Sequence, residues 1–482
     1  MKRVVSGLLV SALASVASAQ PAPPQPAPAP APTPPADPNA PAQPQADSPQ
    51  WLPGVVDVTA AETAVPGKLV LSMKRAVEIA ESQQPTLREA RASLEAAQGR
   101  VDSARVAEHP SVTLSAGVSA GSTQRGYCDL SMTTLCGGFF HGTYGTSLGA
   151  NATWKIYDFG QTAANVHAAE ANAAASQAGI TVSTLDVRRD VEIAYLEALA
   201  RKRLTIVADA TVKSEDAHLD QAKRFVAAQA KDPIEVAQAQ SRDSNAKSAL
   251  AQAQANEAVA LANLRAAIGW VDPTRQPVVD PNWPTADSSQ PPELADLVKV
   301  ARQFRPEITQ LDKEIEAADA SLTAAAAERR PVLSASAGIG WTPAEDDWNP
   351  QPTWQASLGL SWALWDGGRA AADKRIAAAN VTNAIAQRDA LLVSLTSALE
   401  SSRAQIVSNR ANVDASTEAV TAAQAQLKLA EARYAQGLGS QIELADAQTA
   451  VTTASGNLIT AEWQLADAWA TLRRALGQQP QG

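Results

Sequence analysis

The chain contains the same unit twice, and this duplication limits the folds that it can adopt. Ile442–Gln448 reads IELADAQ, and Ile234–Gln240, 208 residues earlier, reads IEVAQAQ. Each motif follows a short break with glycine or proline and opens a long alanine-rich helical pattern. The two patterns also end alike, in LRAAIG at 264–269 and LRRALG at 472–477. The sequence therefore predicts two helical hairpins, each with this motif at its tip.

Composition favours long packed helices over bulky globular cores, because only 4% of the residues are aromatic while alanine is abundant. The net charge of −10 argues against a nucleic-acid partner. The four histidines are scattered, no glycine-rich phosphate loop precedes a helix, and no Ser/His/Asp arrangement is legible. We therefore expect no enzyme, no cofactor and no catalytic residues.

The N-terminus is typical of an exported protein. Residues 1–19 combine Lys2 and Arg3, an apolar stretch and a small-residue cleavage site, as a signal peptide does. Cleavage would leave Gln20 rather than a cysteine at the new N-terminus, so we expect no lipid anchor. Residues 20–68 form a tether and lead-in whose proline-rich part predicts extended chain, either a plain spacer or a segment that spans the cell wall. No stretch of 18 apolar residues predicts a transmembrane helix.

In each copy the pattern changes from helical spacing to strict alternation. The alternating runs predict strands at about 111–124 and 144–158 in the first copy, 69–269, and at about 331–341 and 353–366 in the second copy, 293–477. Residues 270–292 link the copies, and 478–482 form a tail. One face of each strand is apolar, and the other is small and polar.

These strands fit either a membrane β-barrel or a half-buried soluble sheet, since both alternate in this way. Two features favour the membrane. The strands are about as long as the 9–11 residues that cross a bilayer at a tilt, and tryptophans such as Trp154 and Trp362 gather in or beside them. Four strands cannot close a barrel, and an open edge cannot face lipid, so the chain must oligomerise.

Cys128 and Cys136 are the only cysteines and lie in one glycine-rich stretch, GYCDLSMTTLCGG. In an exported protein this spacing favours a disulfide that closes a small loop. A metal site is not expected, because His141 is nearby but no further ligands complete a set of four.

The order of these elements resembles the TolC family of outer-membrane efflux proteins, from about Leu69 to Gly477. The resemblance rests on the tandem helix–strand–strand–helix–helix units, the strand exits WKIYDFGQ at 154–161 and WALWDGGR at 362–369, and the tip RYAQGLGSQIELADAQ. It implies a mainly α fold with a membrane part, in which three chains share a 12-stranded barrel in the outer membrane and a long periplasmic α-helical barrel.

The resemblance also implies a homotrimeric exit duct for drug efflux or type I secretion. Its partners would be a periplasmic adaptor and an inner-membrane ABC or proton-driven transporter. A non-conducting exported stalk that binds partners or the cell wall remains the alternative. An adaptor-type fusion protein fits less well, since it would carry one hairpin rather than two.

The resemblance places candidate functional residues at the tips. Glu443 and Asp446 lie three residues apart on one helix face and match the acidic rings that narrow the periplasmic entrance, although a solvated acidic face would look the same. Tyr434 and Glu235 match residues that bond between hairpins and hold the entrance shut. Gly439 lies where some members carry an arginine that completes this latch, which predicts a weaker closed state.

Overall fold

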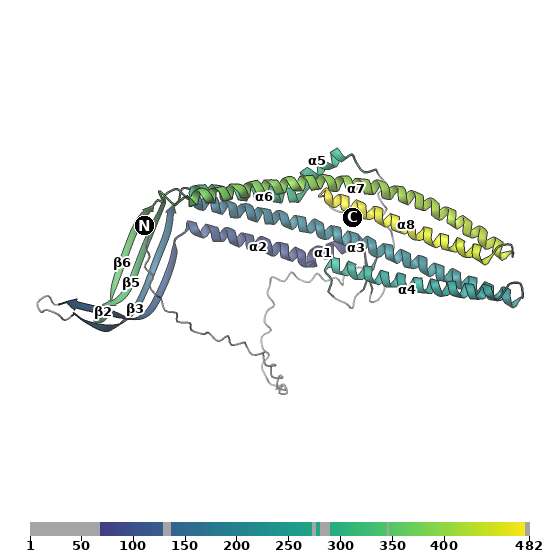
Figure 1. Ribbon diagram of the computed structural model, residues 1–482, viewed down its shortest axis with the longest axis horizontal. Coiled ribbons are helices and arrows are strands. Elements are labelled where there is room, and N and C mark those ends of the chain that lie inside the picture. Colours follow the sequence, from purple (N-terminus) through teal and green to yellow (C-terminus); the bar gives the residue numbers. More distant parts are fainter. Residues whose placement is uncertain (1–67, 129–135, 272–275, 280–289, 345–346, 478–482) are drawn as a thin grey trace, which may run out of the picture. The chain divides into compact units, whose positions relative to one another are not determined.

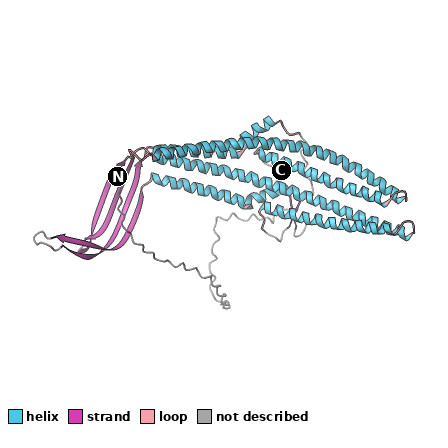
Figure 2. Cartoon of the chain, in the orientation of Figure 1, coloured by secondary structure: helices cyan, strands magenta, loops and turns pink. Residues whose placement is uncertain are grey.

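The computed structural model describes residues 68–128, 136–271, 276–279, 290–344 and 347–477. The expected signal peptide, tether and tail lie outside these residues. Figures 1 and 2 show long helices together with one group of strands. The first copy contains β1 (Lys68–Leu71), α1 (Met73–Gln83), α2 (Pro85–Arg105), the short 3-10 turn η2 (Val106–Glu108), β2 (Ser111–Cys128), β3 (Cys136–Tyr157), α3 (Gln161–Ala227) and α4 (Ile234–Ile268). The second contains α5 (Leu294–Phe304), α6 (Pro306–Ala327), β5 (Val332–Ala344), β6 (Asp347–Ser361), α7 (Arg369–Ala435) and α8 (Gln441–Ala475), with β4 (Gln276–Val279) between the copies.

The long helices α3 and α7 begin at the ends of the two strand exits. Gly160 and Gly368 precede α3 and α7 with φ of 94° and 92°, a conformation that glycine adopts without steric cost. Asp158 Oδ2 accepts the backbone N–H of Thr162 at 2.9 Å, and Asp366 accepts the N–H groups of Gly368 and Ala370. Each carboxylate thus caps a free helix N-terminus.

Helix α3 lies at the centre of the packed helices. It contacts α2 and α6 along one part of its length and α4 and α8 along the other, while α7 packs against α6 and α8. Helices α3 and α7 each have 67 residues, or roughly 100 Å at 1.5 Å per residue. Alanine is the commonest residue at their buried positions, with clusters of larger side chains around Leu199 and Leu264 in the first copy and Leu399 and Leu472 in the second. Small side chains allow such long helices to approach closely.

The four long strands form one antiparallel sheet in the order β2-β3-β5-β6. The pairing of β3 with β5 joins the two copies into a single sheet. The register places the apolar positions of all four strands on one face, in rows such as Leu114, Ala150, Ile339 and Trp354. Val118 is 85% exposed and Trp354 is 81% exposed on this face. Strands β2 and β6 form the two open edges of the sheet.

The strand ends differ from those expected. Strand β3 begins at Cys136 rather than near 144, and β2 continues to Cys128, because backbone pairing extends the hairpin through a glycine-rich stretch where alternation is weak. Strand β6 starts at Asp347 and ends at Ser361 rather than near 366. After Ser361 the chain no longer pairs with β5, and the irregular segment that follows places Asp366 at the start of α7.

The connection between the copies contains a strand that the sequence reading missed. Strand β4 pairs in parallel with β1, with Lys68 opposite Gln276. Tyr195 of α3 donates to the carbonyl of Leu71, and Lys202 donates to that of Val279. The lead-in and the linker are thereby both attached to α3. Among the described helices, none has the length and apolar content needed to cross a bilayer.

Candidate functional site at the hairpin tips

The tips of the two hairpins contact each other through Tyr434, at the end of α7. Its hydroxyl donates to Oε2 of Glu235, in the first turn of α4, at 3.2 Å. Oε1 of the same carboxylate lies 3.3 Å from Nζ of Lys231, which also sits 5.5 Å from the centre of the Tyr434 ring. Phe225 of α3 packs edge-on against that ring at 5.7 Å. We call these four residues the tip cluster.

The environment of Tyr434 is strongly apolar on one side and negatively charged on the other. Its side chain is 1% exposed and packs with Ala430, Leu444 and Ala447. Burial, and then the neighbouring Glu235 carboxylate, raise the pKa of Tyr434 to about 12. The phenol therefore stays protonated at physiological pH and remains a hydrogen-bond donor to Glu235.

The two acidic residues of α8, Glu443 and Asp446, differ in whether a neighbouring cation compensates their charge. Oε1 of Glu443 lies 3.3 Å from Nε of Arg433 on α7, and Ser440 caps the helix by accepting the N–H of Glu443. Asp446 is exposed and makes no ion pair with any residue in the described ranges. Both side chains are in the same part of the tip, but only Asp446 has an uncompensated charge there.

Gly439 has a structural reason to lack a side chain. A Cβ at this position would lie 3.0 Å from the backbone nitrogen of Tyr434 and 3.2 Å from Cβ of Arg433. The N–H of Gly439 also donates to the carbonyl of Arg433, which closes the turn. A cation beside Tyr434 comes instead from Lys231, on the other hairpin.

Polar contacts between the hairpins continue behind the tip cluster. Ser214 of α3 donates to Oε1 of Gln448 on α8 at 3.1 Å, and its oxygen lies 3.2 Å from Nε2 of His218. A neutral His218 with its proton on Nε2 would donate to this hydroxyl oxygen. Burial lowers the pKa of His218; Glu215 and Glu431 oppose this effect, while Arg242 adds to it.

The structure thus brings Tyr434 and Glu235 together, as the sequence reading paired them. That reading missed Lys231, Phe225 and Arg433. The i, i+4 spacing of Lys231 and Glu235 is a local sequence signal for their ion pair. The ring contact of Phe225 with Tyr434 joins distant segments, and no local sequence signal indicates it.

The two cysteines lie in the sheet, away from the tips. Cys128 and Cys136 face each other as the last pair of the β2–β3 register. Directly opposed residues of antiparallel strands have Cα separations of about 4.5–5.5 Å, which lie within the range that disulfides span. The predicted bond fits this backbone geometry and stays a prediction.

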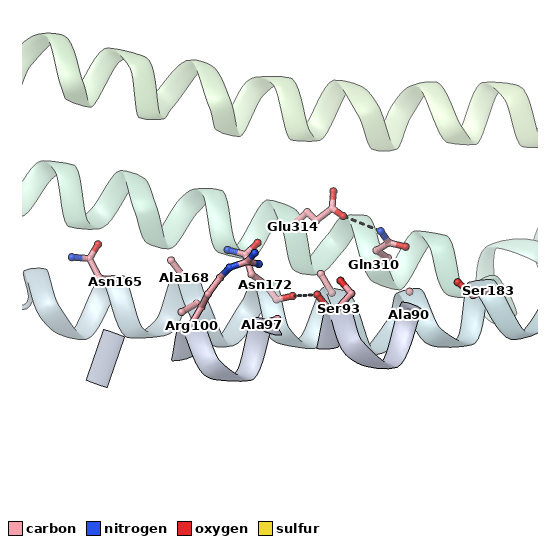
Figure 3. Close-up of a pocket in the computed structure, with 14 residues that line it drawn as sticks. Ala90, Ser93, Ala97, Arg100, Asn165, Ala168, Asn172, Ser183, Gln310 and Glu314 are labelled. Atoms are coloured by element: carbon pink, nitrogen blue, oxygen red, sulfur yellow. Dashed lines mark hydrogen bonds between the residues drawn. The ribbon is translucent and has the colours of Figure 1, made fainter. Parts of the chain in front are cut away.

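A second feature is a hollow of about 840 Å³ between α2, α3 and α6. Figure 3 shows amide groups of Asn165 and Asn172 from α3, Arg100 from α2, and Gln310 with Glu314 from α6. Gln310 donates to Glu314 at 3.0 Å. The base is formed by alanine, serine and glycine, so the hollow is a polar, water-compatible groove with no nucleophile–base pair.

An exposed apolar sheet joined to long paired hairpins defines a subunit of an outer-membrane channel, with its helices in the periplasm. The sequence matches the family model described as outer membrane efflux protein over residues 76–270 and 297–478. The chain belongs to this family, whose members are channels rather than enzymes.

Individual relatives agree with this assignment. The chain is 28% identical to Protein CyaE of Bordetella pertussis over 384 residues, which cover 79% of this chain and 78% of CyaE. It is 24% identical to Nodulation protein T of Rhizobium leguminosarum bv. trifolii over 343 residues, covering 70% and 72% of the two chains. The fold is similar to that of the Campylobacter jejuni CmeC outer membrane channel, with a TM-score of 0.72, 15% identity, and 85% and 87% of the two chains covered.

Proposed function

We propose that three copies of this chain assemble into a continuous duct that carries substrates from periplasmic and inner-membrane partners to the exterior. The observation that carries the proposal is the sheet: its exposed apolar face suits lipid, but β2 and β6 leave two edges unpaired. In lipid those backbone groups need partners, and further copies of the same sheet supply them. Three copies give twelve strands, as the family resemblance implies.

We further propose that the tip cluster is the latch of a periplasmic gate. Tyr434 and Lys231 each bind a different oxygen of Glu235, so one carboxylate ties α7 to the α3–α4 hairpin. Opening the entrance requires the hairpins to separate, and this separation breaks the hydrogen bond of Tyr434 to Glu235, while Lys231 and Glu235 stay together within the α3–α4 hairpin. Glu443 and Asp446 are proposed to set cation selectivity at the same end, with Asp446 as the stronger contributor because Arg433 compensates Glu443.

The tips are also the proposed docking surface for a periplasmic adaptor. Leu438 is 72% exposed, Ile442 is 61% exposed and Ile234 is 60% exposed. Apolar side chains exposed together at the end of a periplasmic hairpin fit a protein partner. The adaptor would connect the duct to an inner-membrane ABC or proton-driven transporter. A stalk without a channel would have no need for the exposed apolar sheet.

The duct proposal is tested with the full-length chain expressed in an outer membrane. We expect a heat-dissociable band at three times the monomer mass on mild gel electrophoresis, and discrete conductance steps after reconstitution into planar bilayers. A monomer that extracts with buffer alone and produces no conductance would contradict the proposal. Deletion followed by parallel drug-susceptibility and secreted-protein measurements would separate the two uses of the duct.

A further inference from the structure

The second strand exit, where β6 leads into α7, carries an exposed apolar and basic surface. The apolar face of β6 continues past Ser361, the last residue of the ladder, into irregular chain. Trp362 is 58% exposed, Leu364 is 70% exposed and Trp365 is 88% exposed. Figure 1 shows this connection between β6 and α7. Large apolar side chains at this level of exposure need an apolar or interfacial environment.

Two arginines lie at the same exit. The indole nitrogen of Trp362 donates to the carbonyl of Arg329 at 3.0 Å, so the tryptophan is fixed beside the end of α6. Arg330 follows directly, is exposed, and donates from Nη1 to the carbonyl of Phe159 at 2.8 Å. Neither arginine makes an ion pair with a residue that the structure describes.

Nearby carboxylates do not cancel these two charges. Glu328 lies 4.0 Å and Asp373 lies 3.5 Å from Nε of Arg369, which is the third arginine of the exit. Asp366 interacts electrostatically with Arg329, but its oxygens accept two backbone N–H groups at the start of α7. Arg329 and Arg330 therefore keep unused guanidinium N–H donors, Arg329 next to the exposed Trp362 and Arg330 between the two exits.

The first copy is an internal control for this surface. It has the same backbone arrangement, in which Trp154 donates its indole N–H to the carbonyl of Glu108 at 3.1 Å. The duplication places Glu108 and His109 at the positions of Arg329 and Arg330. The first copy thus builds its exit with no arginine at these two positions of its own, although Arg330 of the second copy reaches the carbonyl of Phe159 in the first exit.

A neighbouring copy would not cover the surface completely. The first exit lies beside β5 and α6 of the same chain. In an assembly, the second exit would lie beside the corresponding elements of a neighbouring copy. Even so, Trp154 remains 42% exposed and Tyr157 remains 55% exposed. The aromatic residues of the second exit therefore remain available to a further partner.

We propose that the second exit binds the headgroup of an anionic phospholipid in the periplasmic leaflet of the outer membrane. Arg329 and Arg330 donate hydrogen bonds to the phosphate, while Trp362 and Trp365 lie at the level of the glycerol and the upper acyl chains. The inference rests on the proposed membrane position of the sheet, because the helices after this exit are periplasmic and the strands before it face lipid. Anionic headgroups bind to basic residues at the membrane surface, and aromatic residues beside them anchor the protein at that level.

The test uses the full-length protein purified in detergent and mixed with phosphatidylglycerol, with bound lipid counted by native mass spectrometry. We expect the double variant Arg329→Gln/Arg330→Gln to weaken phosphatidylglycerol retention by about thirtyfold. Arg302→Gln, an exposed arginine of α5, is the matched control and should retain lipid as the wild type does. Equal retention in the double variant and the control would overturn the proposal.

A second measurement separates this proposal from that of the duct. In vesicles of brominated phosphatidylglycerol and phosphatidylcholine, lipid quenching of Trp365 is obtained from the difference between the wild type and Trp365→Phe. Strong quenching by lipids brominated near the headgroup is expected. A protein that inserts and conducts but leaves Trp365 unquenched has a protein-covered exit, which refutes the lipid site alone. A protein that neither inserts nor conducts refutes the duct as well.

Discussion

Substituting Tyr434 by phenylalanine removes the central hydrogen bond of the proposed latch and preserves the ring that packs against Phe225. A hydrogen bond to a charged group contributes about 1.5–3 kcal/mol. We take the lower end, about 1.5 kcal/mol, because Glu235 keeps its contact with Lys231 in the variant. This corresponds to roughly a twelvefold increase in the open-to-closed ratio for each copy. Three copies that must open together would give an increase of about two thousandfold.

The assay is single-channel recording of full-length protein in planar bilayers, with open probability as the readout. Thr417→Ala is the matched control, since this α7 hydroxyl is exposed and bonds only to its own helix at the carbonyl of Val413. Lys231→Gln should act in the same direction with less than about a fivefold change, because it removes the cation–π contact between Lys231 and the Tyr434 ring, and such contacts contribute about 0.5–1 kcal/mol at exposed sites. If Tyr434→Phe conducts like Thr417→Ala, the hairpin contact does not hold the entrance closed and the latch reasoning is refuted.

Three further predictions concern other residues. Asp446→Asn should reduce the cation-to-anion permeability ratio by about fivefold, which is the effect of removing a unit charge near 4 Å in water, and Glu443→Gln should reduce it less. Reversal potentials measure both variants, and unchanged selectivity would refute the proposed role. Burial lowers the pKa of His218, so its contribution to tip stability is complete above the unfolded-state value near 6.5 and is lost as the pH falls below it. The protection factors of the tip amides, which correct for the slower intrinsic exchange in acid, should therefore fall with pH in the wild type and not in His218→Gln, and identical profiles would count against this. Intact-mass measurement with alkylation should find Cys128 and Cys136 unreactive until a reductant is added, whereas labelling without reduction would exclude the disulfide.

Local sequence signals accounted for most of the secondary structure. The change from helical spacing to alternation near Pro110 located the start of β2, and Pro85 located the break between α1 and α2. Asp158 and Asp366 belong to the two strand exits read from the sequence, and each caps the helix that follows. Strand ends were less accurate, since pairing can continue through glycine-rich chain where alternation gives no signal.

The site was predictable only in part. The tip motif and the family resemblance led to Tyr434 and Glu235, whose hydrogen bond is present in the structure. The partners that complete the cluster, Lys231 and Phe225, come from the opposite hairpin. Their positions depend on how two helices of 67 residues pack over their full length, and a local pattern carries no information about that packing.

Local sequence patterns were sufficient for the duplicated unit, the helices and strands within it, and the apolar and polar faces of each strand. These properties depend on periods of 3.6 and 2 residues and on caps and breaks, which act over a few positions. Only the tertiary structure decided that β3 pairs with β5, and that the IELADAQ hairpin meets its twin through one tyrosine, one carboxylate and one lysine. The hydrogen bond that joins Tyr434 to Glu235 spans 199 residues of chain, so it forms only when the packing of the whole bundle brings both tips together.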